Sequence, residues 1–208
     1  MDSCITITLL RHGVTKENLA KKYLGWSDPP ITEQAYKELI ILQNQLPLYD
    51  FYMSSDLIRC KQTAEVVVPD TPGLETEHLR EIHFGDWELK TYDELCHDAS
   101  YRNWIDDPFN EQPPGGESFP VFKKRVMKAW KQLLEQMEIQ HSKRVLVVTH
   151  GGVIRLLLTE LTQANRYFWE WQIPHGQGMT LTWSIKEWRE ASTCTSLQAA
   201  PLTEKRHG

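Results

Sequence analysis

The sequence predicts an α/β protein with three layers, in which a mostly parallel open sheet is flanked by helices. Apolar, β-branched runs alternate along the chain with segments of helical periodicity. Two of these runs, 5–10 and 145–149, lead into a loop with histidine and glycine, as a buried parallel strand does at its carboxyl end. We therefore expect both loops to open at the same edge of the sheet.

Length and composition indicate one domain. The chain has 208 residues, of which 40% are apolar, which is enough to fill a single core. We assign residues 1–190 to this domain and 191–208, which are small, polar and aperiodic, to a mobile tail. The 23 basic and 28 acidic residues give a net charge of -5, which argues against general binding to nucleic acid or to a membrane surface.

The first half of the chain predicts two strands and two helices. The strand at 5–10 is followed by an amphipathic helix that begins after Thr32 and stops at Pro47. A short strand at 51–53 precedes a second helix, and Arg59 falls in its first turn. The inner face of this helix is expected to carry Leu57, Cys60, Ala64 and Val67.

Residues 83–116 are rich in Gly, Pro, Trp and acidic groups, and they predict an insertion of helices and loops over the active site. Its aromatic side chains have two plausible uses, which are to stack on a nucleoside-like ring or to pack against the core. These residues are Trp87, Tyr92, Tyr101 and Trp104.

The second half predicts a long helix after Ser118, the strand at 145–149, and a helix over 153–161. Alternation of apolar and polar residues over 179–185 is typical of a strand with one face on the core, and we expect it at the edge of the sheet.

The cysteines indicate neither a zinc site nor a disulfide framework, because they are far apart and form no CxxC pair. We expect reduced, structural thiols. The chain shows no secretion signal and no apolar stretch long enough for a membrane span, so the expected location is the cytoplasm. The cysteines are Cys4, Cys60, Cys96 and Cys194.

The two histidine loops predict a phosphoryl-binding site. His12 and His150 should face one crevice at the carboxyl ends of neighbouring strands. Arg11 and Arg59 are suited to this site because a planar guanidinium can hold two phosphate oxygens at once. Cationic groups stabilise phosphoryl transfer without a metal, and no metal-ligand spacing is present, so we expect no metal and no cofactor.

The reaction also needs a proton donor. Glu81, Asp86 and Glu88 lie in one short stretch, and their positions alone do not distinguish them. A solvated loop charge is an equally ordinary use for each of these carboxylates.

Four segments resemble the histidine phosphatase superfamily. The first, Leu10–Thr15, reads Leu-Arg-His-Gly-Val-Thr and is followed by Asn18. The others are 55–64, 79–88 and 148–155, so the resemblance extends from residue 5 to about residue 185.

This resemblance implies a role for each matching residue. His12 would form a phosphohistidine, and Glu81 would protonate the leaving oxygen and then activate water. His150 would stabilise the transferring group and join the catalytic residues. The substrate phosphate would be bound by Arg11, Asn18, Arg59 and Gly151.

The region from Phe84 to Ser118 is similar to the α-ribazole 5′-phosphate phosphatase branch, whose members act in assembly of the cobalamin nucleotide loop. Leu89 departs from the many relatives that have glycine there. The resemblance implies a metal-independent phosphomonoesterase with a small phosphorylated substrate. Alternatives are a broad-specificity phosphatase, a cofactor-dependent phosphoglycerate mutase, which is usually longer, and a noncatalytic phosphate-binding module.

Overall fold

A six-stranded sheet forms the centre of the protein. The computed structural model describes residues 4–162, 164, 166–190, 194 and 196–201. The strand order is β3-β2-β4-β1-β5-β6; the first four strands in chain order run parallel, while β5 and β6 pair antiparallel. The predicted fold class is therefore confirmed. The strands are β1 (Cys4–Arg11), β2 (Phe51–Ser55), β3 (Gly73–Thr76), β4 (Arg144–Thr149), β5 (Gly178–Ser184) and β6 (Ser196–Ala200).

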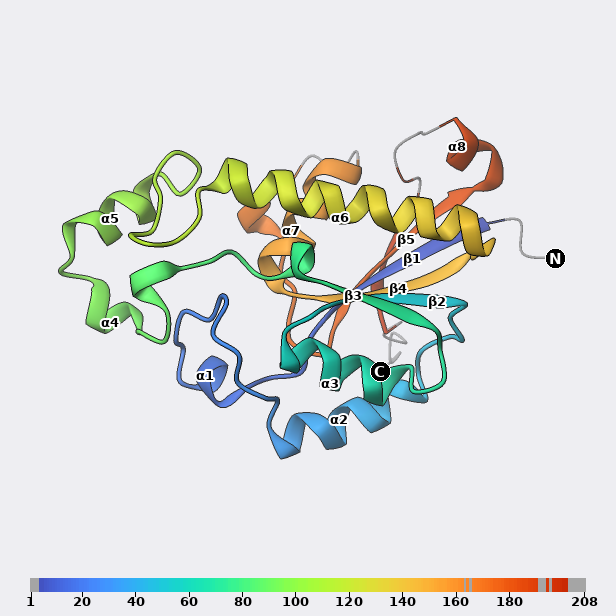
Figure 1. Cartoon of the computed structure of the whole chain (residues 1–208), viewed down its shortest axis with the longest axis horizontal. Helices are drawn as coiled ribbons and strands as arrows, with labels where there is room; N and C mark the ends of the chain where they lie inside the picture. Colours follow the sequence, from blue (N-terminus) through green and yellow to red (C-terminus); the bar gives the residue numbers. More distant parts are fainter. Residues whose placement is uncertain (1–3, 163, 165, 191–193, 195, 202–208) are drawn as a thin grey trace, which may run out of the picture.

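Helices cover both faces of this sheet (Figure 1). On one face lie α2 (Glu33–Gln43) and α3 (Ile58–Val67), and on the other lie α6 (Phe119–Gln140) and α7 (Gly151–Leu161). The core consequently has two parts, one on each side of the sheet. Short elements complete the chain: α1 (Lys16–Leu19), the 3-10 turns η1 (Glu77–Leu79), η2 (Gly85–Trp87) and η3 (Phe168–Glu170), and α8 (Ile185–Arg189).

The alternation of side chains along β1 explains why both parts of the core form. Ile7 and Leu9 pack in the cluster that includes α6 and α7, whereas Leu10 packs with α2 and α3. All three side chains are completely buried. Burial on both faces of the sheet accounts for the continuous apolar sequence of this strand.

The insertion extends beyond the carboxyl ends of the strands, at the left of Figure 1. It contains α4 (Tyr92–Leu95) and α5 (Ala99–Asp106). Trp87, Tyr101 and Trp104 are buried together in a small core, while Tyr92 is 58% exposed. Most of the aromatic residues singled out here therefore pack against one another.

The last described strand corrects two predictions. β6 pairs with the outer side of β5, so β5 is not the edge strand that the sequence predicted. The expectation of a mobile tail is wrong for residues 196–200, which form β6. The sequence did not predict this strand because only Ala200 of its residues is buried. An exposed edge strand does not need the alternation of apolar and polar residues that marks a strand in a sequence. Residues 191–193, 195 and 202–208 of the predicted tail lie outside the described residues.

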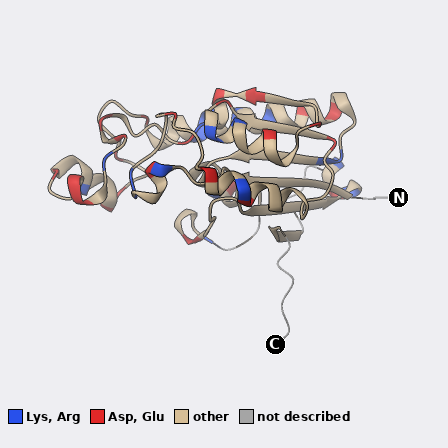
Figure 2. Ribbon diagram, turned by 90° about the horizontal axis from the view of Figure 1, so that it is seen from below, with Lys and Arg blue, Asp and Glu red and all other residues tan. Residues whose placement is uncertain are grey.

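Acidic and basic residues are interspersed along the described ribbon (Figure 2). In the described part of the chain, every helix is too short or too polar to cross a membrane.

Candidate active site

Two histidines lie side by side where β1 and β4 end. These strands are neighbours, with Arg11 opposite Thr149, and the backbone N–H of His12 donates to the carbonyl of Thr149 at 2.9 Å. The ring centroids of His12 and His150 are 5.1 Å apart. The sequence thus correctly predicted that both loops open at one edge, because parallel neighbours end together.

The contacts of His12 select one form of its ring. The Nδ1 atom lies 2.7 Å from the carbonyl oxygen of Gly13, which can only accept, so Nδ1 carries the proton. Burial, together with Arg59, His175 and Arg11, holds the pKa of His12 well below its usual value. The ring is therefore neutral, and Nε2 keeps a free lone pair.

His150 is held in the adjoining loop. Its Nε2 atom lies 3.0 Å from the hydroxyl of Ser55 and 3.5 Å from the sulfur of Cys60. Burial and the positive charge of Arg59 lower the pKa of His150. Burial raises the pKa of the Cys60 thiol to about 12, which keeps this cysteine in its unreactive form, in agreement with a structural thiol.

Two arginines with buried Nε atoms act electrostatically on the histidines. Nη1 of Arg11 donates to the carbonyl of Ile173 at 2.8 Å, and the Arg59 guanidinium donates to the carbonyls of Ser27 and Gly25 at 2.8 and 2.6 Å. Among the described residues, neither Nε atom has a hydrogen-bond partner. A buried cationic donor without a partner is costly, and an anion would satisfy it.

Both arginines remain protonated at neutral pH. Burial lowers the pKa of Arg11 to about 10, opposed by the negative charge of Glu81 and reinforced by Arg155 and Arg59. Burial likewise lowers the pKa of Arg59 from its usual value. The site therefore keeps a concentration of positive charge within a protein of net charge -5.

The carboxylate of Glu81 is fixed beside this positive charge. Its oxygens accept hydrogen bonds from the backbone N–H groups of Gly152 at 2.8 Å and Ile82 at 3.0 Å. The backbone carbonyl of Glu81 accepts from Arg125 at 2.7 Å and from the Trp26 indole at 3.0 Å. Side chain and main chain are thus both anchored.

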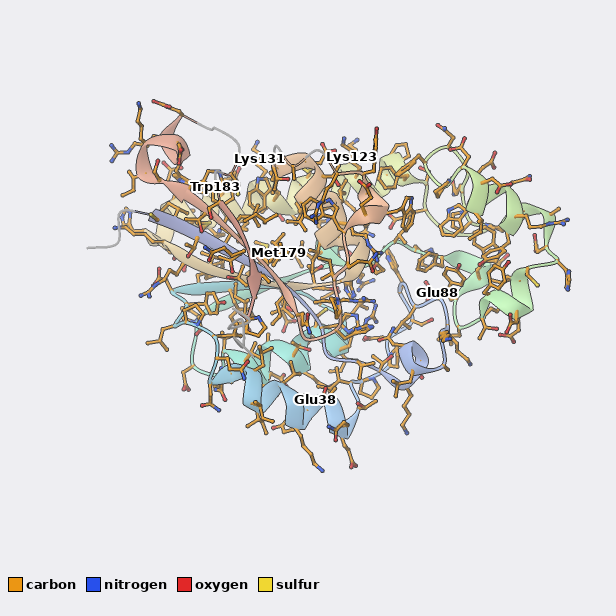
Figure 3. All side chains as sticks on the ribbon, turned by 180° about the vertical axis from the view of Figure 1, so that it is seen from behind. Glu38, Glu88, Lys123, Lys131, Met179 and Trp183 are labelled. Carbon is orange, nitrogen blue, oxygen red and sulfur yellow. The ribbon has the colours of Figure 1, made fainter. Side chains whose placement is uncertain are left out.

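Glu88, the second candidate acid, has a different environment. Its carboxylate accepts from the backbone N–H groups of Trp26 and Phe84 at 2.8 and 3.1 Å through Oε1, and of Gly25 and Ser27 at 3.1 Å through Oε2. Figure 3 shows this residue where the insertion joins the central fold. The carbonyls of Gly25 and Ser27 hold Arg59, so Glu88 positions the loop that orients the Arg59 guanidinium.

The third candidate, Asp86, is exposed on η2. Its backbone N–H donates to the carbonyl of Pro114 at 2.8 Å. The tertiary structure therefore distinguishes three carboxylates that their sequence positions did not.

Asn18 and Gly151 occupy the margins of the site. Asn18 caps α1, since its side-chain oxygen accepts from the backbone N–H of Thr15 at 3.1 Å, and it also lines the cavity described below. A Cβ atom on Gly151 would lie 3.2 Å from the guanidinium carbon of Arg11. Glycine therefore allows Arg11 to approach the start of α7 closely. The catalytic and binding roles of all seven residues stay predictions.

His175 is a third histidine at the site, and no sequence motif pointed to it. Its ring centroid lies 5.0 Å from that of His12, and its Nδ1 atom lies 3.3 Å from the His12 carbonyl oxygen. Burial, with Arg11 and Arg59, lowers the pKa of His175 to about 4. The loop before β5 brings this residue to the site, a contact that its position in the sequence does not disclose.

Leu89 adopts a backbone conformation that favours glycine, with φ of +63°. Its N–H donates to the carbonyl of Tyr23 at 2.8 Å. Leu89, at a position where many relatives have glycine, therefore adopts the left-handed backbone conformation itself.

A cavity of about 660 Å³ extends from Arg11 and Glu81 toward the insertion. Arg11, Glu81 and Gly152 line it together with aromatic residues of α5, α6, η3 and their adjoining loops. This volume suits a small organic ligand. Among the residues described, no cluster of three or more His, Cys, Asp or Glu side chains is arranged to hold a metal ion.

Comparisons with known proteins agree with this geometry. An Adenosylcobalamin/alpha-ribazole phosphatase of Salmonella typhimurium is 34% identical over 81% of this chain and 85% of its own length. The crystal structure of the Alpha-ribazole Phosphatase from Shigella flexneri matches with a TM-score of 0.76 and 28% identity, covering 85% of this chain and 90% of that one.

A 2,3-bisphosphoglycerate-dependent phosphoglycerate mutase 2 of Gloeobacter violaceus is 30% identical over 74% of both chains. The family model of the histidine phosphatase superfamily (branch 1) matches residues 7–194. The protein therefore belongs to the histidine phosphatase superfamily.

Proposed function

We propose that this phosphatase hydrolyses α-ribazole 5′-phosphate, with His12 as its nucleophile. The observation that carries the proposal is the Nδ1 contact of His12 with the Gly13 carbonyl, which leaves Nε2 unprotonated on a ring that feels the positive charges of Arg59 and Arg11. Relatives with this printed activity cover most of the chain. We propose the cytoplasm as the place of reaction, since a charged nucleotide does not cross a membrane readily.

In the first step, Nε2 of His12 attacks the phosphorus atom. The bond from phosphorus to the ribose oxygen breaks, and that oxygen takes a proton from Glu81, which enters this step as the carboxylic acid and leaves it as the carboxylate. Arg11, Arg59 and His150 offset the negative charge that develops on the phosphoryl oxygens. Asn18 and the Gly151 backbone N–H are proposed as further phosphate contacts.

In the second step, water attacks the phosphohistidine. Glu81 accepts a proton from this water, the phosphorus–nitrogen bond breaks, and inorganic phosphate leaves with neutral His12 restored. The two backbone hydrogen bonds of Glu81 support this role, because they keep one carboxylate in place for both proton transfers.

The test is phosphate release by the purified protein, with chelator present, from α-ribazole 5′-phosphate, nucleotides, sugar phosphates and 3-phosphoglycerate. We expect a clear preference for α-ribazole 5′-phosphate. Similar low rates on many esters would indicate a broad phosphatase, and isomerisation of 3-phosphoglycerate without release would indicate a mutase. An absence of turnover on the whole panel would favour a binding module.

A second experiment tests the intermediate. With substrate labelled in its phosphoryl group, the protein should acquire an acid-labile, base-stable label, and His12→Ala should abolish both labelling and turnover while keeping the wild-type circular dichroism spectrum. Turnover by a folded His12→Ala variant at the wild-type rate would refute the proposed nucleophile.

A further inference from the structure

Aromatic side chains from three segments line the same cavity as Arg11 and Glu81. Phe109 comes from the loop after α5, Phe119 from the start of α6, and Phe168 and Trp169 from η3. The ring centroids of Phe109 and Phe119 are 4.6 Å apart, and those of Phe168 and Trp169 are 4.7 Å apart. Phe119 and Phe168 connect the two pairs at 5.6 Å. These four residues form one continuous aromatic wall.

Arg155 links the aromatic wall to the phosphate-binding groups. It lies on α7, where its Nε atom donates to the carbonyl of Trp171 at 3.0 Å. Its guanidinium carbon is 5.7 Å from the centroid of Trp169, and its positive charge also acts on Arg11. A ligand whose phosphate lies at Arg11 can therefore extend past Arg155 to the aromatic wall within one cavity.

The wall contains both packed and exposed members. Phe119 and Phe168 pack against the main core, so their positions are fixed. Phe109 and Trp169 are 39% and 49% exposed. Large apolar groups that remain exposed beside a polar site commonly mark the surface that a ligand covers.

We infer that Phe109, Phe119, Phe168 and Trp169 form the subsite that binds the aromatic base of the substrate by stacking. The inference rests on the proposed function and adds the residues that select the base. The base of α-ribazole is a benzimidazole, which has a flat bicyclic ring and no exocyclic amino or oxo group. Stacking on phenyl and indole rings recognises such a base without hydrogen bonds.

The polar side chains that line the cavity lie outside the aromatic wall. Asn18 is the one amide side chain among the described residues that line the cavity, and it belongs to α1 rather than to the aromatic wall. The charged lining residues Lys22, Asp106 and Asp107 lie outside the four rings of the wall. A nucleobase with amino and oxo groups that stacks on the wall would therefore lose water there without a hydrogen bond from the rings in return. We therefore expect the subsite to favour α-ribazole 5′-phosphate over adenosine and guanosine monophosphates.

The test compares two substrates that differ by the base alone. Trp169→Ala and Phe109→Ala should each lower kcat/KM for α-ribazole 5′-phosphate by roughly 5- to 150-fold, the range that follows from the loss of one stacking contact. Turnover of ribose 5-phosphate, which has no base to stack, should fall by a much smaller factor. Trp169→Phe should retain most of the activity on α-ribazole 5′-phosphate.

Tyr36→Ala is the matched control, because Tyr36 is an aromatic residue of α2 that is 51% exposed and does not line the cavity. It should leave both substrates unaffected. Equal losses on both substrates in the Trp169 and Phe109 variants would assign the wall a structural role and overturn the inference. Full activity of both variants on α-ribazole 5′-phosphate would overturn it as well.

Failure of the proposed function would look different. In that case the wild-type protein would not prefer α-ribazole 5′-phosphate over ribose 5-phosphate. The existence of the subsite is then tested by binding. The measurement is whether the nucleoside α-ribazole competes with ribose 5-phosphate for the protein. Competition by α-ribazole that Trp169→Ala weakens would support the subsite, and a lack of competition would refute it.

Discussion

The carboxylate of Glu81 and the backbone N–H of Gly152 are joined by a 2.8 Å hydrogen bond at the start of the helix that follows His150. The proposed acid and the loop of the second histidine are thereby fixed relative to each other, although they are 69 or more positions apart in the sequence. This bond requires a close approach that only glycine permits, because a Cβ atom at position 152 would lie 2.3 Å from Glu81 Oε1.

Gly152→Ala should therefore reduce activity without unfolding the protein. The obstructed atom is the end of a flexible side chain, so Glu81 can move without unfolding the protein, at a cost of about 1 kcal/mol for its hydrogen bond to the Gly152 N–H. A displacement of about 1 Å from a reactive geometry can lower a rate by about 100-fold. We expect a fall in kcat of about that size in steady-state kinetics, with a thermal midpoint lowered by only about 2–4 °C. A kcat equal to that of the wild type would contradict the proposed role of this contact.

Three isosteric substitutions should distinguish the roles of the neighbouring carboxylates. Glu88→Gln removes an acceptor for two backbone N–H groups in the loop that holds Arg59, and it should lower the free energy of unfolding by about 2–4 kcal/mol. Its KM should also rise, because Arg59 loses its fixed position. Glu81→Gln should instead lower kcat, most for substrates with poor leaving groups.

Asp86→Asn is the matched control, since it removes the same charge from an exposed side chain of the same stretch. Denaturant unfolding and steady-state kinetics should both remain within error of the wild type. A Glu88→Gln variant as stable as Asp86→Asn would show that the three hydrogen bonds from Glu88 to residues 25–27 do not hold the loop.

Stability should decrease as the pH falls below about 6.5. His12, His150 and His175 have lowered pKa values in the folded protein, so the unfolded chain takes up protons that the folded protein does not. Between pH 7 and pH 5.5, each of these histidines should reduce the free energy of unfolding by about 1.3 kcal/mol. Urea unfolding at the two pH values measures the sum.

His175→Gln should remove about one third of this pH dependence, because glutamine does not titrate. Above pH 7 the wild type and the variant should have parallel stability profiles. An identical slope in both proteins below pH 6.5 would show that His175 titrates in the folded state with its ordinary pKa.

Leu89→Gly should raise the free energy of unfolding by about 0.5–1 kcal/mol. A left-handed conformation costs an L-residue about 1–2 kcal/mol, and the glycine variant is free of this strain. Glycine also makes the unfolded chain more flexible, which offsets about 0.5–1 kcal/mol of the gain. Leu89 is 41% exposed, so little buried surface is lost. Leu89→Ala, which keeps the Cβ atom, should give no gain. The midpoint of urea unfolding distinguishes these outcomes.

Local sequence determined the strands of the core and the loops that follow them. Apolar runs at 5–10 and 145–149 are buried on both faces of the sheet, and this burial leaves few other structures open to them. The positions of His12 and His150 follow, because adjacent parallel strands bring their carboxyl ends together. Arg59 in the first turn of α3 was predictable for the same local reasons.

Only the tertiary structure decided the environment of a side chain where that environment depends on residues distant in the sequence. The carboxylates of Glu81, Asp86 and Glu88 have different environments. Glu81 accepts a hydrogen bond from Gly152, Asp86 is exposed to solvent, and Glu88 accepts hydrogen bonds from the 25–27 loop. His175 and the aromatic wall come together from distant segments. Their sequence patterns resemble those of ordinary loops and core residues, since a local pattern reports burial and not which distant residue a side chain contacts.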